Sequence, residues 1–131
     1  MRATAIRRRG VRLPVVKRSG KADYEAALAL QCRLAGLPAP MREFRFAAPE
    51  RQWRFDLYFP EGRLAVEVEG VTFRGPAGRH QRGDGLREDC VKYATALLKG
   101  IRVLRVMQDH VTSGQALNWI VLALAARGGD A

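Results

Sequence analysis

The sequence is poor in cysteine and has no long hydrophobic run. Its two cysteines, Cys32 and Cys90, lie far apart and lack the paired spacing of a zinc site, so they indicate neither a structural zinc ion nor a defined disulfide. We expect both thiols to be buried, because free cysteine behaves as a small hydrophobic residue. No apolar stretch is long enough to cross a bilayer, and no signal-peptide pattern opens the chain. The sequence therefore predicts a soluble, intracellular protein.

Acidic residues are also scarce relative to basic ones. Against 23 lysines and arginines stand 13 aspartates and glutamates, which leaves a formal net charge of +10. An excess of fixed positive charge favours polyanionic partners, because their counterions are released on binding. Nucleic acid is therefore the expected partner. A membrane surface fits less well, since neither end contains a basic helix with a bulky apolar opposite face.

The beginning of the chain contains basic residues and no acidic one. Residues 1–18 predict a basic arm that contacts phosphates, although a solubilising tail without contacts has the same composition. The remaining residues, 19–131, are enough for one domain and too few for two. The arm residues expected to contact phosphates are Arg7, Arg8, Arg9, Arg12, Lys17 and Arg18.

Periodicity and turn signals divide the domain into helices and strands. A turn at residues 60–62 joins two strands into a hairpin, and the glycine-rich segment 74–85 predicts a mobile surface loop. A helix between the hairpin and the last strand allows a crossover connection. The pattern predicts an α/β fold with a mixed central β-sheet flanked by α-helices. The expected helices run from residues 19–21 to 36, from 86 to 99 and from 112 or 113 to 127, and the expected strands cover 43–46, 52–59, 63–69 and 101–107.

The predicted hairpin gathers acidic residues on one face. Asp56 alternates with apolar neighbours in its first strand, and Glu67 and Glu69 alternate in the same way in its second strand. Like charges so placed repel one another, and a hard divalent cation relieves that repulsion. We expect Mg²⁺, with Mn²⁺ as a substitute. Alternatively, the carboxylates face solvent and pair with Arg54 and Arg63. The apolar residues assigned to the opposite face of the first strand are Trp53, Phe55, Leu57 and Phe59.

Four segments together resemble the PD-(D/E)XK nuclease superfamily, in particular its small phage and bacterial members. The resemblance spans roughly residues 20–107 and implies a restriction-endonuclease-like three-layer core. It also implies that Asp56, Glu67 and the backbone carbonyl of Val68 bind the metal. The segments are Arg54-Phe55-Asp56, Ala65-Val66-Glu67-Val68-Glu69-Gly70, Gly78-Arg79-His80 and Asp89-Cys90-Val91-Lys92-Tyr93.

One position departs from the superfamily pattern. Glu69 stands where the signature lysine usually follows the second acid, and Lys92 on the next helix is the candidate replacement. If Lys92 does not fill that role, Glu69 itself is expected to help bind a second metal ion or to orient the water. Glu25 on the first helix resembles the superfamily's additional acidic residue. The loop residues expected to contact DNA are Arg74, Arg79, His80 and Arg82.

The resemblance implies an Mg²⁺-dependent DNA endonuclease that hydrolyses phosphodiester bonds with a metal-activated water, in the cytoplasm of a bacterium or of a phage-infected host. A basic arm without a separate sequence-reading domain favours branched DNA, as in Holliday-junction resolvases, which act as homodimers. No small-molecule cofactor and no membrane partner are expected. Three alternatives stay open: a sequence- or mismatch-specific duplex endonuclease, a catalytically inactive DNA-binding module of the same fold, and a ribonuclease.

Overall fold

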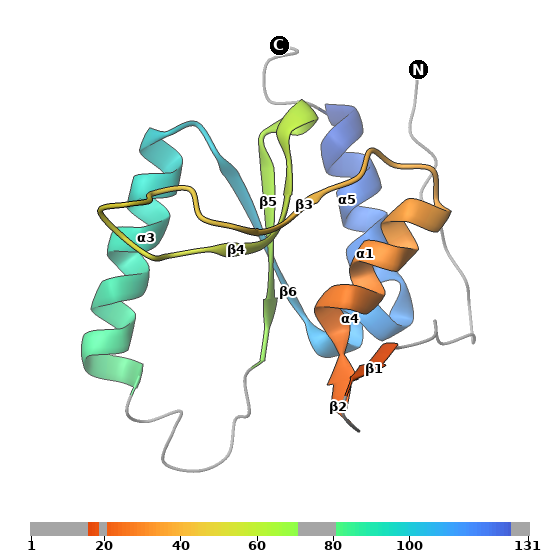
Figure 1. Ribbon diagram of the computed structural model, residues 1–131, viewed down its shortest axis with the longest axis horizontal. Coiled ribbons are helices and arrows are strands. Elements are labelled where there is room, and N and C mark those ends of the chain that lie inside the picture. Colours follow the sequence, from red (N-terminus) through yellow and green to blue (C-terminus); the bar gives the residue numbers. More distant parts are fainter. Residues whose placement is uncertain (1–15, 19–20, 71–80, 127–131) are drawn as a thin grey trace.

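The computed structural model describes residues 16–18, 21–70 and 81–126. Within them the chain forms a mixed α/β structure (Figure 1). None of the helices in these ranges is long and apolar enough to span a membrane. The elements are β1 (Val16–Arg18), β2 (Lys21–Asp23), α1 (Tyr24–Leu34), β3 (Met41–Phe44), β4 (Phe55–Phe59), the 3-10 turn η1 (Pro60–Gly62), β5 (Leu64–Glu69), the helical turn η2 (Gln81–Gly85), α3 (Leu86–Leu98), β6 (Arg102–Met107), α4 (Gln108–Ser113) and α5 (Gln115–Ala126).

The central sheet has four strands in the order β3-β4-β5-β6. The pairs β3-β4 and β4-β5 are antiparallel, and β5-β6 is parallel, with α3 in the connection between the last two strands. A mixed sheet was predicted from the hairpin followed by a helical crossover, and the structure confirms it. The strands β1 and β2 form a separate antiparallel pair, so residues 16–18 of the predicted arm belong to a small two-stranded sheet.

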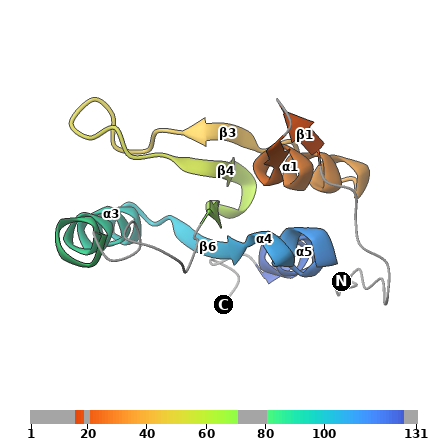
Figure 2. The ribbon, with the colours of Figure 1, turned by 90° about the horizontal axis from the view of Figure 1, so that it is seen from below.

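Helices lie on both sides of the central sheet. Figure 2 shows α3 on one side and α1, α4 and α5 on the other. The buried side chains form two clusters that match this division. The cluster against α1, α4 and α5 is apolar, and it includes Leu28, Leu57, Phe59, Val66 and Ile120, each fully buried. Burial of such side chains stabilises the fold by about 1.5–3 kcal/mol each relative to exposure.

The cluster against α3 is smaller and more aromatic. Phe55 is fully buried there and stacks on Phe46, with ring centroids 4.7 Å apart. Phe44 stacks on Tyr58 on the same side of the sheet, at 4.2 Å. This cluster also contains Ala65, which lies between Leu64 and Val66 of β5. The alternation predicted for β5 is therefore confirmed.

The alternation predicted for β4 is wrong at its beginning. Phe55 packs in the α3 cluster, whereas Leu57 packs in the opposite one, although both were assigned to one face. Trp53 also joins the α3 cluster. The neighbouring strand β3 contains Glu43 with a φ of 49°, a left-handed conformation that interrupts regular pairing. Asp56 thus lies within β4 just beyond Leu57, the last residue of the β4-β5 ladder.

Several predicted boundaries also differ from the structure. Helix α1 begins at Tyr24, because the side chain of Asp23 caps it by accepting a hydrogen bond from the Ala26 N–H at 2.9 Å. The expected last helix corresponds to α5, and the short helix α4 before it, which ends at Gly114 with a φ of 86°, was not predicted. Strand β3 lies two residues earlier than predicted, and β4 begins three residues later than predicted and ends at the predicted residue. The segment 81–85, predicted as loop, forms the helical turn η2 before α3.

Helix α3 faces the sheet with a different side from the one its apolar spacing predicted. In the sequence an apolar stripe at helical spacing runs through Leu86, Cys90, Tyr93, Ala94 and Leu97. Tyr93 packs in the α3 cluster, but Leu86 is 56% exposed, Leu97 is 74% exposed and Cys90 is exposed. The buried positions are Lys92 and Ala96. Cys32 is buried as predicted, so the prediction for the two cysteines is right for one and wrong for the other. Spacing along a helix identifies an apolar stripe, but not the face that the sheet covers.

Candidate functional site

Asp56 lies where β4 and β5 separate. The last regular pair of these strands on this side is Leu57 with Val66. Beyond it, the Val68 N–H donates a hydrogen bond to Asp56 Oδ2 at 2.7 Å. Burial raises the pKa of Asp56, the Val68 hydrogen bond opposes that rise, and the charge of Glu67 adds to it. The two predicted metal ligands Asp56 and Glu67 are thus close enough to repel.

Glu67 is bound by two side chains of α3. Lys92 Nζ lies 2.6 Å from Glu67 Oε1, and the Tyr93 hydroxyl donates to Glu67 Oε2. Lys92 is only 8% exposed, and its ammonium lies 4.7 Å from the ring centroid of Phe55. Most lysines on helices are exposed to solvent, but Lys92 is buried. An ammonium removed from water and paired with a carboxylate has a defined position.

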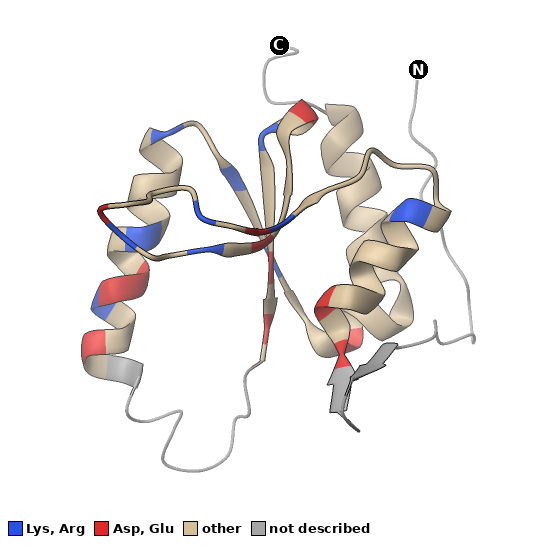
Figure 3. Ribbon diagram, viewed as in Figure 1, with Lys and Arg blue, Asp and Glu red and all other residues tan. Residues whose placement is uncertain are grey.

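Glu25 reaches the same region from the first turn of α1. Its Oε1 accepts a hydrogen bond from Arg42 Nε at 3.1 Å. Burial raises the pKa of Glu25, the Arg42 hydrogen bond opposes that rise, and the charge of Asp56 adds to it. Figure 3 shows acidic positions on β5 and at the start of α1, on two different elements of the fold. The charge of Asp56 reaches Glu25, and the charge of Glu67 reaches Asp56, so the three carboxylates belong to one region.

Glu69 has a different partner. Arg105 of β6 donates through Nε to Glu69 Oε1 at 2.7 Å, and its guanidinium carbon lies 4.9 Å from the ring centroid of Tyr93. The hydrogen bond with Glu69 raises the pKa of Arg105. Burial and the hydrogen bond to Glu67 raise the pKa of the Tyr93 hydroxyl. These contacts order Glu67 and Glu69 on the α3 side of the sheet.

The structure brings together a subset of the predicted residues. Asp56, Glu67 and Lys92 form one group with Glu25 beside it, while Glu69 pairs with Arg105. Lys17 and Arg18 belong to β1, and Arg82 belongs to η2. The other predicted DNA-contacting residues lie outside the described residues, and they are Arg7, Arg8, Arg9, Arg12, Arg74, Arg79 and His80.

Sequence reasoning missed three residues of this region. Tyr93 and Arg105 contact the acidic residues of β5, and Arg42 contacts Glu25. Tyr93 follows Lys92 directly in the sequence. Arg105 stands between the apolar residues Leu104 and Val106 of β6. A basic residue between two apolar residues of a strand was the available signal. Arg42 gave no signal, because its role depends on where α1 passes β3.

The oxygen atoms of this group suit a hard divalent cation. Asp56 and Glu67 offer carboxylate oxygens, and Val68 offers a backbone carbonyl, which are the donor types that Mg²⁺ prefers. Within the described residues there is no group of three or more His, Cys, Asp or Glu side chains able to hold a metal ion. Mg²⁺ is commonly held by one or two carboxylates together with water and substrate phosphates. The fit therefore rests on the pair Asp56 and Glu67.

Comparison of the chain with protein-family models, with curated proteins and with solved structures gave no match.

Proposed function

We propose that this chain is a divalent-metal-dependent DNA endonuclease of the PD-(D/E)XK type, with a restriction-endonuclease-like fold. The observation that supports this most is the contact between Lys92 of α3 and Glu67 of β5, at 2.6 Å. It supplies a lysine beside the second acid although position 69 of the motif is a glutamate. Asp56, from the neighbouring strand, lies close enough for Glu67 to raise its pKa.

In this proposal Asp56, Glu67 and the Val68 carbonyl hold Mg²⁺ or Mn²⁺. The bound cation supplies a Lewis acid for the phosphate and makes water a better nucleophile. The N–H of Val68 holds Asp56 in place, so the strand that carries one acid also orients the other. When the cation binds, Glu67 would give up part of its contact with Lys92 and Tyr93 and bind the cation instead. A role for Glu69 in metal binding would require it to leave Arg105.

Lys92 has two tasks in this proposal. Its ammonium orients Glu67, and it places a fixed positive charge where the phosphate acquires additional negative charge during hydrolysis. Burial next to Phe55 strengthens that charge effect, because water screens it less. Glu25, held by Arg42, is positioned to orient a water molecule beside Asp56. Arg105 and Tyr93 keep the carboxylates of β5 on one side of the sheet.

DNA is the proposed substrate because of the net charge of +10 and the basic residues outside the site. Branched DNA is favoured over plain duplex, because the basic residues of segment 1–18 would contact phosphates, which position the protein without reading sequence. A homodimer would present two sites to two opposed strands of a junction. A nuclease that reads sequence or mismatches in duplex DNA is the nearest alternative.

Cleavage of a labelled four-way junction and of its matched linear duplex tests this function. Each substrate is incubated with Mg²⁺, with Mn²⁺ and with chelator, using the wild type and Glu67→Ala. We expect metal-dependent cutting of the junction that Glu67→Ala reduces more than about 100-fold, because the loss of outer-shell metal partners alone costs about 10–100-fold. Arg51→Ala, on the connection between β3 and β4, is the matched control and should cut normally.

The substrate comparison separates the alternatives. Equal cutting of both DNAs would indicate a general or sequence-reading nuclease. Tight binding of the junction without cutting in any metal would contradict the enzyme and leave a DNA-binding module of this fold. Retained cutting by Glu67→Ala would contradict the site.

A further inference from the structure

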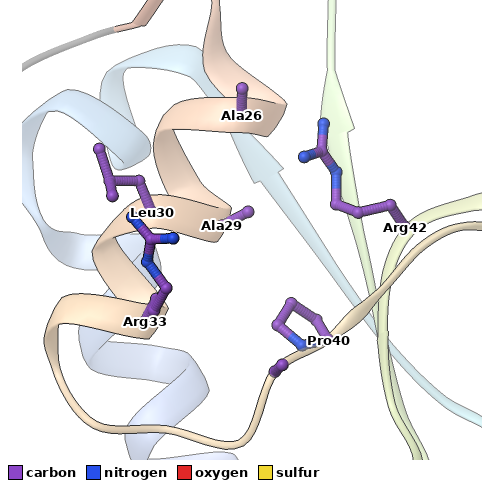
Figure 4. Close-up of a pocket in the computed structure, with 7 residues that line it drawn as sticks. Ala26, Ala29, Leu30, Arg33, Pro40 and Arg42 are labelled. Carbon is purple, nitrogen blue, oxygen red and sulfur yellow. The ribbon is translucent and has the colours of Figure 1, made fainter.

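A hollow of about 280 Å³ lies between α1 and the segment that leads into β3. Small aliphatic side chains line its floor, and Figure 4 shows that they come from two separate parts of the chain. Alanine and proline offer no side-chain hydrogen-bonding group, so the floor suits the apolar face of a ligand. The floor residues are Ala26, Ala29, Leu30, Ala39 and Pro40.

Two arginines line the same hollow. Arg33 comes from the last turn of α1, and Arg42 comes across from β3 (Figure 4). Arg33 is exposed, and among the described residues it has no acidic partner. Arg42 is 44% exposed and keeps donor groups beyond the Nε that binds Glu25. The hollow therefore combines an apolar floor with a positively charged rim.

The hollow adjoins the candidate catalytic site through Arg42. The same guanidinium lines the hollow and binds Glu25, and Glu25 is affected by the charge of Asp56. A ligand in the hollow is thus separated from the carboxylates by one side chain. The hollow lies on the α1 side of the sheet, whereas Lys92 approaches from α3.

We infer that this hollow binds the sugar and phosphate of a nucleotide next to the one that is cut, with the sugar against the alanines and the phosphate on Arg33 and Arg42. Guanidinium groups bind phosphate through two parallel hydrogen bonds, and sugar carbons provide the apolar contact. The inference rests on the proposed function for the identity of the strand. It adds a binding site on the opposite side of Asp56 from Lys92.

The first test removes the charge of Arg33. Binding of a labelled four-way junction is measured by fluorescence anisotropy in chelator, over a series of salt concentrations, for the wild type, Arg33→Ala and the control Arg51→Ala. We expect Arg33→Ala to weaken binding roughly tenfold and to reduce the salt slope by about 0.9, the value for one phosphate contact. An effect no larger than that of Arg51→Ala would overturn the inference.

The second test fills the hollow without changing charge. Ala39 is exposed on the segment before β3, so Ala39→Leu is expected to fold, and thermal melting verifies this. We expect Ala39→Leu to weaken junction binding several-fold with an unchanged salt slope, because it displaces the sugar and leaves both arginines. Wild-type affinity in Ala39→Leu would show that no ligand covers the floor and would overturn the inference.

A free nucleotide is the other source of the same chemistry. Its test is the thermal shift caused by thymidine monophosphate in the wild type and in Ala39→Leu. A shift that Ala39→Leu abolishes, with unchanged junction binding by both proteins, would overturn the assignment to a DNA strand. Failure of the proposed function is recognised separately. If the wild type binds DNA through the hollow but never cuts it, the nuclease is contradicted. If the wild type cuts DNA and both variants bind it normally, the role of the hollow is contradicted.

Discussion

The two sides of the central sheet are built from different kinds of residue. On the side of α1, α4 and α5, the core consists of apolar side chains such as Leu57, Phe59 and Val66, all fully buried. On the side of α3, the sheet presents Glu67 and Glu69, and the buried Lys92 of the helix binds Glu67. Burial of apolar side chains stabilises a fold without requiring a specific partner, whereas a buried charge is destabilising unless it is paired.

Under the proposed function, the α1 side supplies most of the stability of the fold and the α3 side holds the charged residues of the candidate site. Helix α3 places Lys92 against the sheet while it leaves Leu97 and Leu98 74% and 86% exposed. A helix selected for stability alone would bury the leucines and expose the lysine. The arrangement therefore sacrifices some stability on the α3 side, and the comparison predicts unequal consequences of mutation on the two sides.

The largest effect is expected in the apolar core. Phe59→Ala should lower the free energy of unfolding by about 3–5 kcal/mol, because it leaves a cavity where a fully buried ring was. Urea unfolding measures this value. Leu97→Ala on α3 is the control and should change stability by less than about 0.5 kcal/mol. Equal losses in the two variants would contradict the difference between the two sides.

The next effect concerns the pair Lys92 and Glu67, whose side chains are 11% and 18% exposed. Lys92→Met should destabilise the protein by about 2 kcal/mol, below the 3–5 kcal/mol expected for a fully buried pair, because it leaves the Glu67 charge without its ammonium. The double variant with Glu67→Gln should recover part of the loss. Urea unfolding of both single variants and of the double variant tests this, and additive losses would show that the two residues are not coupled.

A smaller effect, of opposite sign, is expected at Asp56. Burial raises its pKa in the folded protein, so the stability it contributes is present below its unfolded pKa and is lost as the pH rises through the folded pKa. Asp56→Asn should therefore raise the melting temperature at neutral pH, and this gain should shrink on acidification below the ordinary aspartate range. Thermal melting at several pH values tests this, and Glu61→Gln, a substitution at an exposed position, is the control. A gain that is independent of pH would contradict the role of burial.

The smallest effect is expected for Glu69. Its partner Arg105 is 51% exposed, so Glu69→Gln should change stability by less than about 1 kcal/mol. Thermal unfolding measures the change, and a larger loss would indicate a more deeply buried interaction. The cleavage assay adds a second result. A loss of cutting as large as that of Glu67→Ala would place Glu69 among the metal ligands, and near-normal cutting would leave it as the partner of Arg105.

The sequence predicted the order of the main elements better than the faces that they present. The β4-β5 hairpin, α3 and β6 were predictable, because their periodic patterns are long and end at Pro60 or Gly100. The α3 face was not, since a lysine that packs on a sheet has the same sequence signal as a solvated one. The change of face between Phe55 and Leu57 was not predictable either, and the left-handed Glu43 on the neighbouring strand β3 is a feature that no local pattern of β4 reveals.

The candidate site was predictable in part for the same reason. The position of Glu67 followed from the alternation in β5, which is a local property, whereas the same argument for Asp56 relied on an alternation that the beginning of β4 does not keep. The pairing of Glu69 with Arg105 depends on the register of two parallel strands, in which Glu67 lies opposite Arg105 and Glu69 opposite Met107. That register is fixed by tertiary packing and not by either strand alone.

The unequal burial of the two cysteines has a practical consequence. Burial raises the pKa of the Cys32 thiol to about 12, so at neutral pH this residue is a poor nucleophile as well as an inaccessible one. Cys90 is exposed on the outer surface of α3. A thiol-reactive fluorophore should therefore attach to the natural protein at one defined position. Energy transfer from that position to a dye on DNA would report where a bound strand lies relative to α3.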